Sequence, residues 1–302
     1  MSLIYVPQGS INAGDLIYED TQIEWDGLLM GVDTYFGYKS LTGWDDLPAT
    51  DSADSPRPRN HGDFAGPMYS QGRIITFDTQ VWTQKEQFPE LRKEFLRRTQ
   101  ITPDERTLTI RQHGETMFAY ARVVNRSWPI NRAYFGGYPV PQVQWKATDP
   151  RKYSLVEQST DLQVPSTSGG LDWTTGGGSN WTPGLDWGTQ VTGASAIVNS
   201  GLSDTPLRFE FYGPLTGPYY VNAPGNFALG FDLDLAPGET LIADARLGTV
   251  TLGGVDRYYA LTLDSDLPED CVALPGSTPV QFVPGAPGDL GHVTIFWRDA
   301  QM

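Results

Sequence analysis

Residues that could ligate a metal or act in acid–base catalysis are scattered along this sequence. The three histidines, His61, His113 and His292, are far apart in the chain, and none has a second ligand at metal-binding spacing. The sequence has no H-x-x-x-H, C-x-x-C or calcium-loop pattern. We therefore expect no metal site and no cofactor.

The single cysteine lacks the surroundings of a nucleophile. Cys271 follows Glu269 and Asp270, whose negative charges raise the pKa of a thiol. A lone cysteine also excludes an internal disulfide framework, which is typical of a reducing compartment. We expect Cys271 to be inert.

The acidic and glycine-rich segments do not form a catalytic motif either. The pairs Asp45–Asp46 and Glu269–Asp270 lie in polar loops, whereas glycosidase carboxylates face each other across about 5–9.5 Å. The sequence has no G-x-S-x-G motif, and glycines 176–178 lack the Lys-Ser/Thr of a phosphate-binding loop. We predict that the protein is not an enzyme.

Three tryptophans lie in a glycine-rich loop at about residues 165–193. The tetrapeptide Gly-Leu-Asp-Trp occurs twice there and ends at Trp173 and Trp187, with Trp181 between them. Aromatic faces suit sugar rings, so these side chains could bind carbohydrate. The alternative, which we favour, is that they anchor the loop to its domain or pack against a neighbouring subunit.

Composition limits the class of protein further. The 302 residues include 33 Gly and 23 Pro, which favours many turns between short strands. A length of about 300 residues predicts two domains of about 150 each. The formal net charge is −15, and most of it falls in residues 151–302, so we expect no specific nucleic-acid binding.

Targeting signals are not evident in the sequence. No apolar run approaches the ~18–20 residues of a membrane span, so we expect no membrane insertion. The first residues lack the basic start and apolar stretch of a signal peptide. We therefore expect the chain to be cytosolic at synthesis.

The first half predicts a mostly β domain with one helix. Residues 20–45 are aromatic and β-rich, residues 46–67 are expected to be a loop, and residues 72–82 predict one long strand. The candidate side chains of this long strand are Arg73, Ile75, Phe77, Thr79 and Val81.

The helix signal follows at once. Residues 83–86 fit a capping box, and Phe88, Leu91 and Phe95 recur at helical spacing, although Pro89 suggests that the helix begins near that residue. A basic run within this segment is interleaved with acids, so we interpret it as a solvated face of paired charges: Arg92, Lys93, Arg97 and Arg98 with Glu90 and Glu94.

The second half predicts a β-sandwich or jelly roll. About eight short alternating segments are separated by Gly/Pro turns, as in antiparallel sandwiches. They are residues 194–199, 207–212, 227–235, 240–244, 249–252, 257–263, 280–282 and 292–298.

Several segments, taken in order, resemble the distal tail (Dit) proteins of siphoviruses, the bacteriophages with long, flexible tails. They are Pro58-Arg59-Asn60-His61-Gly62, the stretch 143–154 ending Asp149-Pro150-Arg151-Lys152-Tyr153-Ser154, the stretch 198–207, and the ending 293–300. The resemblance covers roughly residues 55–302. The turn Leu274-Pro275-Gly276-Ser277-Thr278-Pro279 departs from the family pattern "L-x-P-G-x-N".

The resemblance implies a structural virion protein without a catalytic site. Residues 1–155 would form a β-barrel-like ring domain that closes with five copies into a hexamer, and residues 156–302 a galectin-like or carbohydrate-binding-module-like sandwich. The expected partners are the tail tube protein, the tail-tip hub (baseplate) protein, the tape measure protein in the lumen, and a host-wall glycan. The location would be the distal end of the phage tail, reached after assembly in the host cytoplasm.

An alternative function class stays open at this point. The tryptophan loop and the sandwich also fit a carbohydrate-binding or polysaccharide-cleaving jelly-roll protein that acts on the host cell wall. In that case Trp173, Trp181 and Trp187 would contact the glycan.

Overall fold

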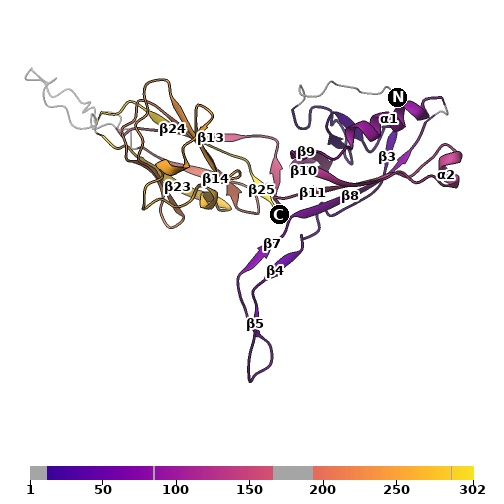
Figure 1. Ribbon diagram of the computed structural model, residues 1–302, viewed down its shortest axis with the longest axis horizontal. Helices are drawn as coiled ribbons and strands as arrows, with labels where there is room; N and C mark the ends of the chain where they lie inside the picture. The colour runs from indigo at the N-terminus through magenta and orange to yellow at the C-terminus, as the bar shows by residue number, and fades with distance from the viewer. Residues whose placement is uncertain (1–11, 84–85, 166–192, 287) are drawn as a thin grey trace, which may run out of the picture. The chain divides into compact units, whose positions relative to one another are not determined.

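A computed structural model describes residues 12–83, 86–165, 193–286 and 288–302. Contacts divide the chain into two compact units (Figure 1). The first comprises Met1–Leu155 with Gln301–Met302, and the second comprises Val156–Ala300. The described residues are mostly β-strand, as the sequence predicts, with two α-helices, α1 (Phe88–Arg98) and α2 (Arg132–Phe135).

A nine-stranded sheet organises the first unit. Seven strands pair in the order β2-β1-β9-β10-β11-β8-β3, and β12 pairs with both β10 and β25. Their bounds are β1 Ile23–Trp25, β2 Leu28–Met30, β3 Phe36–Thr42, β8 Arg73–Val81, β9 Arg106–Gln112, β10 Glu115–Ser127, β11 Gln142–Ala147, β12 Lys152–Ser154 and β25 Ala300–Gln301.

Large aromatic side chains fill the core of this unit. Trp25 and Trp145 are both fully buried, with ring centroids 5.7 Å apart. On helix α1, Leu91 and Phe95 are buried, and Phe95 lies 5.4 Å from the ring of Phe36 on β3. Helix α1 therefore covers the sheet through its apolar face, as helical spacing predicts.

The start of α1 corrects one sequence prediction. The N-cap residue is Gln87, which makes no side-chain capping bond, and Pro89 lies in the first turn. The prediction of a capping box at residues 83–86 is therefore wrong. A helix that began there would have Pro89 in its interior, whereas a proline is tolerated in the first turn.

The charged face of α1 is partly as expected. Glu94 pairs with Arg97 and with Arg98, each at 2.8 Å. Burial opposes ionisation of Glu94, but the bonds from the two arginines outweigh it and lower the pKa of the carboxyl. Arg98 is not solvated, however: it is 3% exposed and also bonds to the Asp26 carbonyl oxygen.

The segment expected to be a plain loop forms a long, narrow hairpin, hereafter the arm (residues 50–70). Strand β4 (Thr50–Ser52) pairs with β7 (Met68–Ser70), and β5 (Ser55–Pro56) pairs with β6 (Asp63–Phe64). The arm projects from the first unit beyond the ends of β3 and β8 (Figure 1).

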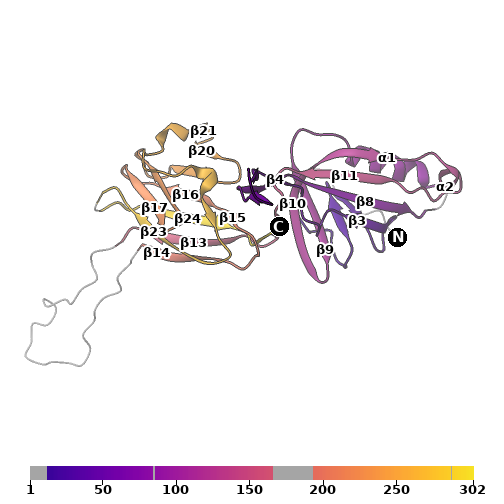
Figure 2. The ribbon, with the colours of Figure 1, turned by 90° about the horizontal axis from the view of Figure 1, so that it is seen from below.

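Two sheets enclose one hydrophobic core in the second unit (Figure 2). The six-stranded sheet has the order β13-β24-β16-β19-β20-β21, and the four-stranded sheet has the order β14-β23-β17-β18. The bounds are β13 Gln158–Gln163, β14 Ala194–Asn199, β15 Thr205–Pro206, β16 Arg208–Tyr212, β17 Tyr219–Ala223, β18 Phe227–Phe231, β19 Thr240–Asp244, β20 Thr249–Leu252, β21 Val255–Asp256, β22 Val272–Ala273, β23 Gly276–Val283 and β24 His292–Trp297.

Seven of the eight segments predicted as strands in this unit contain a strand. Residues 257–263 are not a strand, since a 3₁₀ helix occupies Tyr258–Ala260. The Asp256 carboxylate accepts a bond from the Tyr258 N–H at 2.9 Å and so starts a turn there. Strands β13, β15, β17, β21 and β22 were not predicted from the sequence.

Candidate functional site

The five candidate residues of the long strand all point into the core. Along β8, the side chains of Arg73, Ile75, Phe77, Thr79 and Val81 are buried, at 0–1% exposure. They stabilise the sheet and are not available to another molecule.

Arg73 is the unusual member of this set. Its Nε donates to the Pro150 carbonyl oxygen at 2.9 Å, and its Nη1 donates to the carbonyl oxygens of Gly43, Trp44 and Asp46 at 2.6–2.9 Å. Burial lowers the pKa of the guanidinium, and the charges of Asp45 and Asp46 oppose that effect. Arg73 therefore joins two loops to the sheet.

The opposite side of β8 is the one that another molecule can reach. Asp78 accepts bonds from Ser40 Oγ on β3 and from Gln142 Nε2 on β11, both at 2.8 Å. Gln144 Nε2 donates to Thr76 Oγ1 at 3.0 Å in the next row. These cross-strand bonds fix the polar side chains of this face of the sheet, and at one end of it Ile74 is 53% exposed.

The arm carries apolar side chains that its own unit does not bury. Phe64, Met68 and Tyr69 are 57%, 63% and 71% exposed. Arg57 lies over the Phe64 ring, 5.0 Å from its centroid. An isolated two-stranded hairpin is marginally stable in water, and exposed apolar patches mark contact sites. The arm is therefore a candidate contact element.

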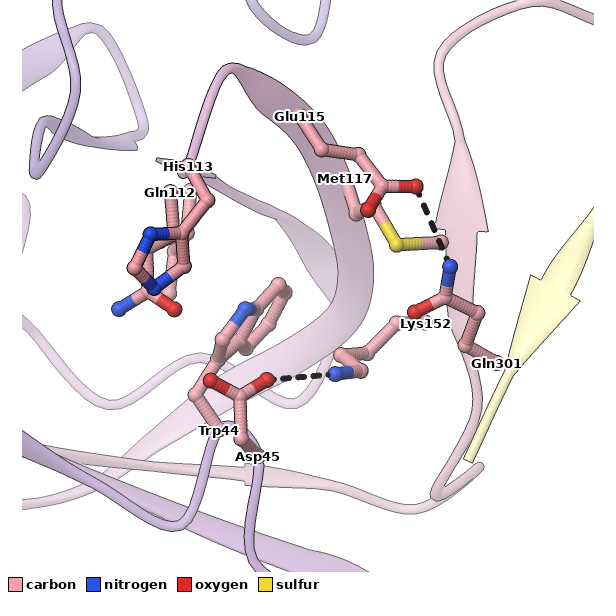
Figure 3. A pocket seen from close by; sticks show the side chains of 9 residues that line it. Trp44, Asp45, Gln112, His113, Glu115, Met117, Lys152 and Gln301 are labelled. Atoms are coloured by element: carbon pink, nitrogen blue, oxygen red, sulfur yellow. Dashed lines mark hydrogen bonds and ion pairs between the residues drawn. The ribbon is translucent and has the colours of Figure 1, made fainter. Parts of the chain in front are cut away.

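A small polar pocket of about 100 Å³ lies in the first unit (Figure 3). Lys152 Nζ bonds to Asp45 Oδ1 at 2.9 Å and lies 5.3 Å from the centroid of the Trp44 ring. Across the pocket, Gln301 Nε2 donates to Glu115 Oε1 at 3.1 Å. Both carboxylates are thus already paired, and the arrangement ties the end of the chain to the first unit.

The other residues singled out from the sequence are not brought into one site. His61 lies in the arm, His113 in the turn between β9 and β10, and His292 on β24. Among the described residues, no group of three or more His, Cys, Asp or Glu side chains could hold a metal ion. Within the same residues, no helix is long and apolar enough to cross a membrane.

Cys271 is buried. Burial, followed by the charges of Asp266, Asp270 and Glu269, raises the pKa of its thiol to about 12. A thiol in that environment stays protonated at neutral pH and cannot act as a nucleophile. Trp173, Trp181 and Trp187 lie outside the described residues.

Comparison of the fold with solved structures finds similar phage proteins. The Dit protein of phage SPP1, described as a paradigm of the hub adsorption apparatus in phages that infect Gram-positive bacteria, matches with a TM-score of 0.64 at 13% identity. The match covers 93% of this chain and 99% of that one. No protein-family model and no curated protein sequence matches the chain.

Two further matches are chains of the phage P2 baseplate in its activated conformation, one with Ca and one with Sr. Both are 11% identical and cover 91% of this chain, with TM-scores of 0.47 and 0.46. They cover 97% and 96% of those chains. The match to SPP1 Dit confirms the predicted resemblance at the level of the fold: this chain has the fold of the SPP1 Dit protein.

Proposed function

We propose that this protein is a structural subunit of a long-tailed phage and forms a ring at the distal end of the tail. The observation that carries the proposal is the likeness to SPP1 Dit along nearly the full length of both chains. The SPP1 protein is described as a paradigm of the hub adsorption apparatus, and a chain of the same fold suits the same kind of role.

The finer form of the proposal is a homohexamer built by the first unit. The ring joins the tail tube protein to the tail-tip hub, lets the tape measure protein pass through its lumen, and supports host attachment. Its working location is the virion. The protein acts by assembly rather than by catalysis, in keeping with a pocket whose carboxylates are already paired and a cysteine with a raised pKa.

Within this proposal the arm is the element that contacts a neighbouring subunit. Its Phe64, Met68 and Tyr69 are exposed, so they gain apolar burial when they pack against another subunit. The tip of the arm carries two basic residues, Arg57 and Arg59. Because each copy of the chain has a net charge of −15, a neighbouring copy attracts these arginines.

A shortened arm tests the proposal. Thr50 and Ser70 are directly paired, so Asn-Gly can replace residues 51–69 as a two-residue hairpin turn. A matched control replaces only residues 57–62 by Asn-Gly, between the paired Pro56 and Asp63.

We expect the wild type to form rings in negative-stain images and the arm-less variant to lose them. The tip control, which keeps Phe64, Met68 and Tyr69, is expected to retain them in part. If rings persist in the arm-less variant, the arm does not form the contact that assembles the ring.

A further inference from the structure

The pocket of the first unit can take a further positive charge. Its charged lining consists of two acids, Asp45 and Glu115, and one base, Lys152. Lys152 bonds to Asp45 Oδ1, and Gln301 bonds to Glu115 Oε1 (Figure 3). No residue that the structure describes donates to the second oxygen of either carboxylate. A carboxylate accepts about four hydrogen bonds, so both acids keep free acceptors.

The pocket also has the size and the walls that an arginine side chain needs. Its volume is about 100 Å³, whereas a cavity of about 150 Å³ holds a benzene molecule. The pocket therefore suits a planar group smaller than benzene, such as a guanidinium. Trp44 and Met117 are 5% and 6% exposed, and they give the lining an apolar part against which the stem of an arginine can pack.

One arginine of the arm has no partner. Arg59 lies at the tip of the arm and is exposed, and its side chain makes no hydrogen bond or ion pair with any described residue. Arg57 differs, because its guanidinium lies over the Phe64 ring. Arg59 is therefore the guanidinium of the arm that is free to bind another molecule.

The backbone of the tip is restrained around this arginine. The Arg57 N–H donates to the Gly62 carbonyl oxygen at 3.2 Å, which closes the tip. Pro56 and Pro58 flank Arg57, and a proline ring fixes the backbone φ angle. A preorganised loop loses less conformational entropy when it binds, so the tip suits a specific contact.

The arm does not bring Arg59 to the pocket of its own copy. Arg59 comes nine residues after Thr50, at the base of the arm, which is about 30 Å of extended chain. Asp45 precedes that base by only five residues, and the arm projects away from the first unit (Figure 1). The tip is therefore available to a second copy. A contact between two unlike surfaces, here tip and pocket, is the kind that closes copies into a ring.

We propose that Arg59 of one copy enters the pocket of the next copy and bonds to the free carboxylate oxygens of Asp45 and Glu115. The five N–H donors of a guanidinium form a planar fork that matches carboxylate groups. Hydrogen bonds between charged groups are about twice as strong as neutral ones. This contact rests on the proposed ring and adds to it the place where the tip of the arm docks.

Two charge reversals test the contact in the full chain. Arg59→Glu and Glu115→Arg each bring like charges together, so either variant alone should lower the fraction of rings at least tenfold. Light-scattering mass and negative-stain images measure that fraction. A 1:1 mixture of the two variants should restore the rings, because each tip then meets a pocket of opposite charge. Lys93→Glu and Asp104→Arg are the matched controls; they make the same charge changes at exposed positions outside arm and pocket and should leave the rings intact.

The mixture also separates the contact from a folding defect. Calorimetric melting first shows whether each variant is folded. Two folded variants that fail alone can restore each other only through a contact between copies. One chain that carries both Arg59→Glu and Glu115→Arg should likewise form rings.

A chemical cross-link tests the contact without relying on the ring. Cys271 is buried, so a short bismaleimide reacts with introduced cysteines. Asn60 adjoins Arg59, and Gln112 lines the pocket. Asn60→Cys chains mixed with Gln112→Cys chains should give a band at twice 33.3 kDa. That band should be at least tenfold stronger than in the control mixture of Asn60→Cys with Asp104→Cys.

The outcomes distinguish this contact from the proposed ring. Rings that persist in both charge-reversal variants, or folded variants that do not restore each other, would overturn the contact and leave the ring standing. If the wild type forms no ring, or if Glu115→Arg does not fold, the cross-link decides. A band specific to Gln112→Cys supports the contact, and its absence overturns it. A specific band without any rings would count against the proposed ring alone.

Discussion

The buried guanidinium of Arg73 makes four bonds to backbone carbonyl groups in two loops. Hydrogen bonds from a charged donor contribute about 1.5–3 kcal/mol each, and their loss leaves the carbonyls without donors. We expect Arg73→Met to lower the free energy of unfolding by about 3 kcal/mol or more, measured by urea titration.

Arg111→Met is the matched control for that substitution. Arg111 pairs with Asp20 at 3.2 Å, and both side chains are substantially exposed. An exposed pair contributes about 0–1 kcal/mol, so this variant should unfold near the wild-type midpoint. Equal losses in the two arginine variants would contradict the role assigned to Arg73.

His113 occupies a turn position that few residues tolerate. It has φ 52° and Gly114 has φ 80°, in the two-residue turn that joins the paired Gln112 and Glu115. Both central residues of a type I′ turn need positive φ, which Asn and Gly adopt readily and β-branched residues do not.

We therefore expect His113→Asn to leave thermal stability unchanged and His113→Val to lower it by about 1–2 kcal/mol. Calorimetric melting of the two variants checks this. A valine variant as stable as the asparagine variant would mean that the turn relaxes to another backbone geometry.

Buried and exposed side chains alternate along strand β8, and substitutions at two neighbouring positions can test this assignment. Ile75 is fully buried, whereas Ile74 is 53% exposed on the polar face. We expect Ile75→Ala to cost about 2–5 kcal/mol and Ile74→Ala to stay within about 0.5 kcal/mol. Urea unfolding measures both, and similar costs would contradict the assignment of faces.

Elements with strong alternation could be predicted from the sequence. Strands β19 and β20 have the predicted bounds, Thr240–Asp244 and Thr249–Leu252, because apolar and polar residues alternate between clear turn residues. The segment 257–263 shows similar alternation, but the turn started by Asp256 overrides it. The hydrophobic periodicity of a sequence does not reveal local side-chain hydrogen bonds of this kind.

The strands of the arm and strand β13 could not be predicted from the sequence for a related reason. The arm has no buried face, so its strands carry no hydrophobic period, and pairing alone defines them. In β13, Leu162 is the only fully buried side chain among polar neighbours, and pairing with β24 makes it a strand.

At the scale of the whole molecule, the account depends on self-association. The first unit has a polar, rigid sheet face and an arm with unburied apolar side chains, and both suit contact with further copies. The second unit has its own core and its own two sheets.

Light-scattering mass of the purified full chain, with negative-stain imaging in the same buffer, tests the central claim most directly. We predict six-fold rings with a mass near six times 33.3 kDa. Because a ring can need its tube neighbour as a template, the same measurement is repeated with the tail tube protein added. A 33.3 kDa monomer under both conditions would contradict the proposal that this chain forms the distal ring of a phage tail.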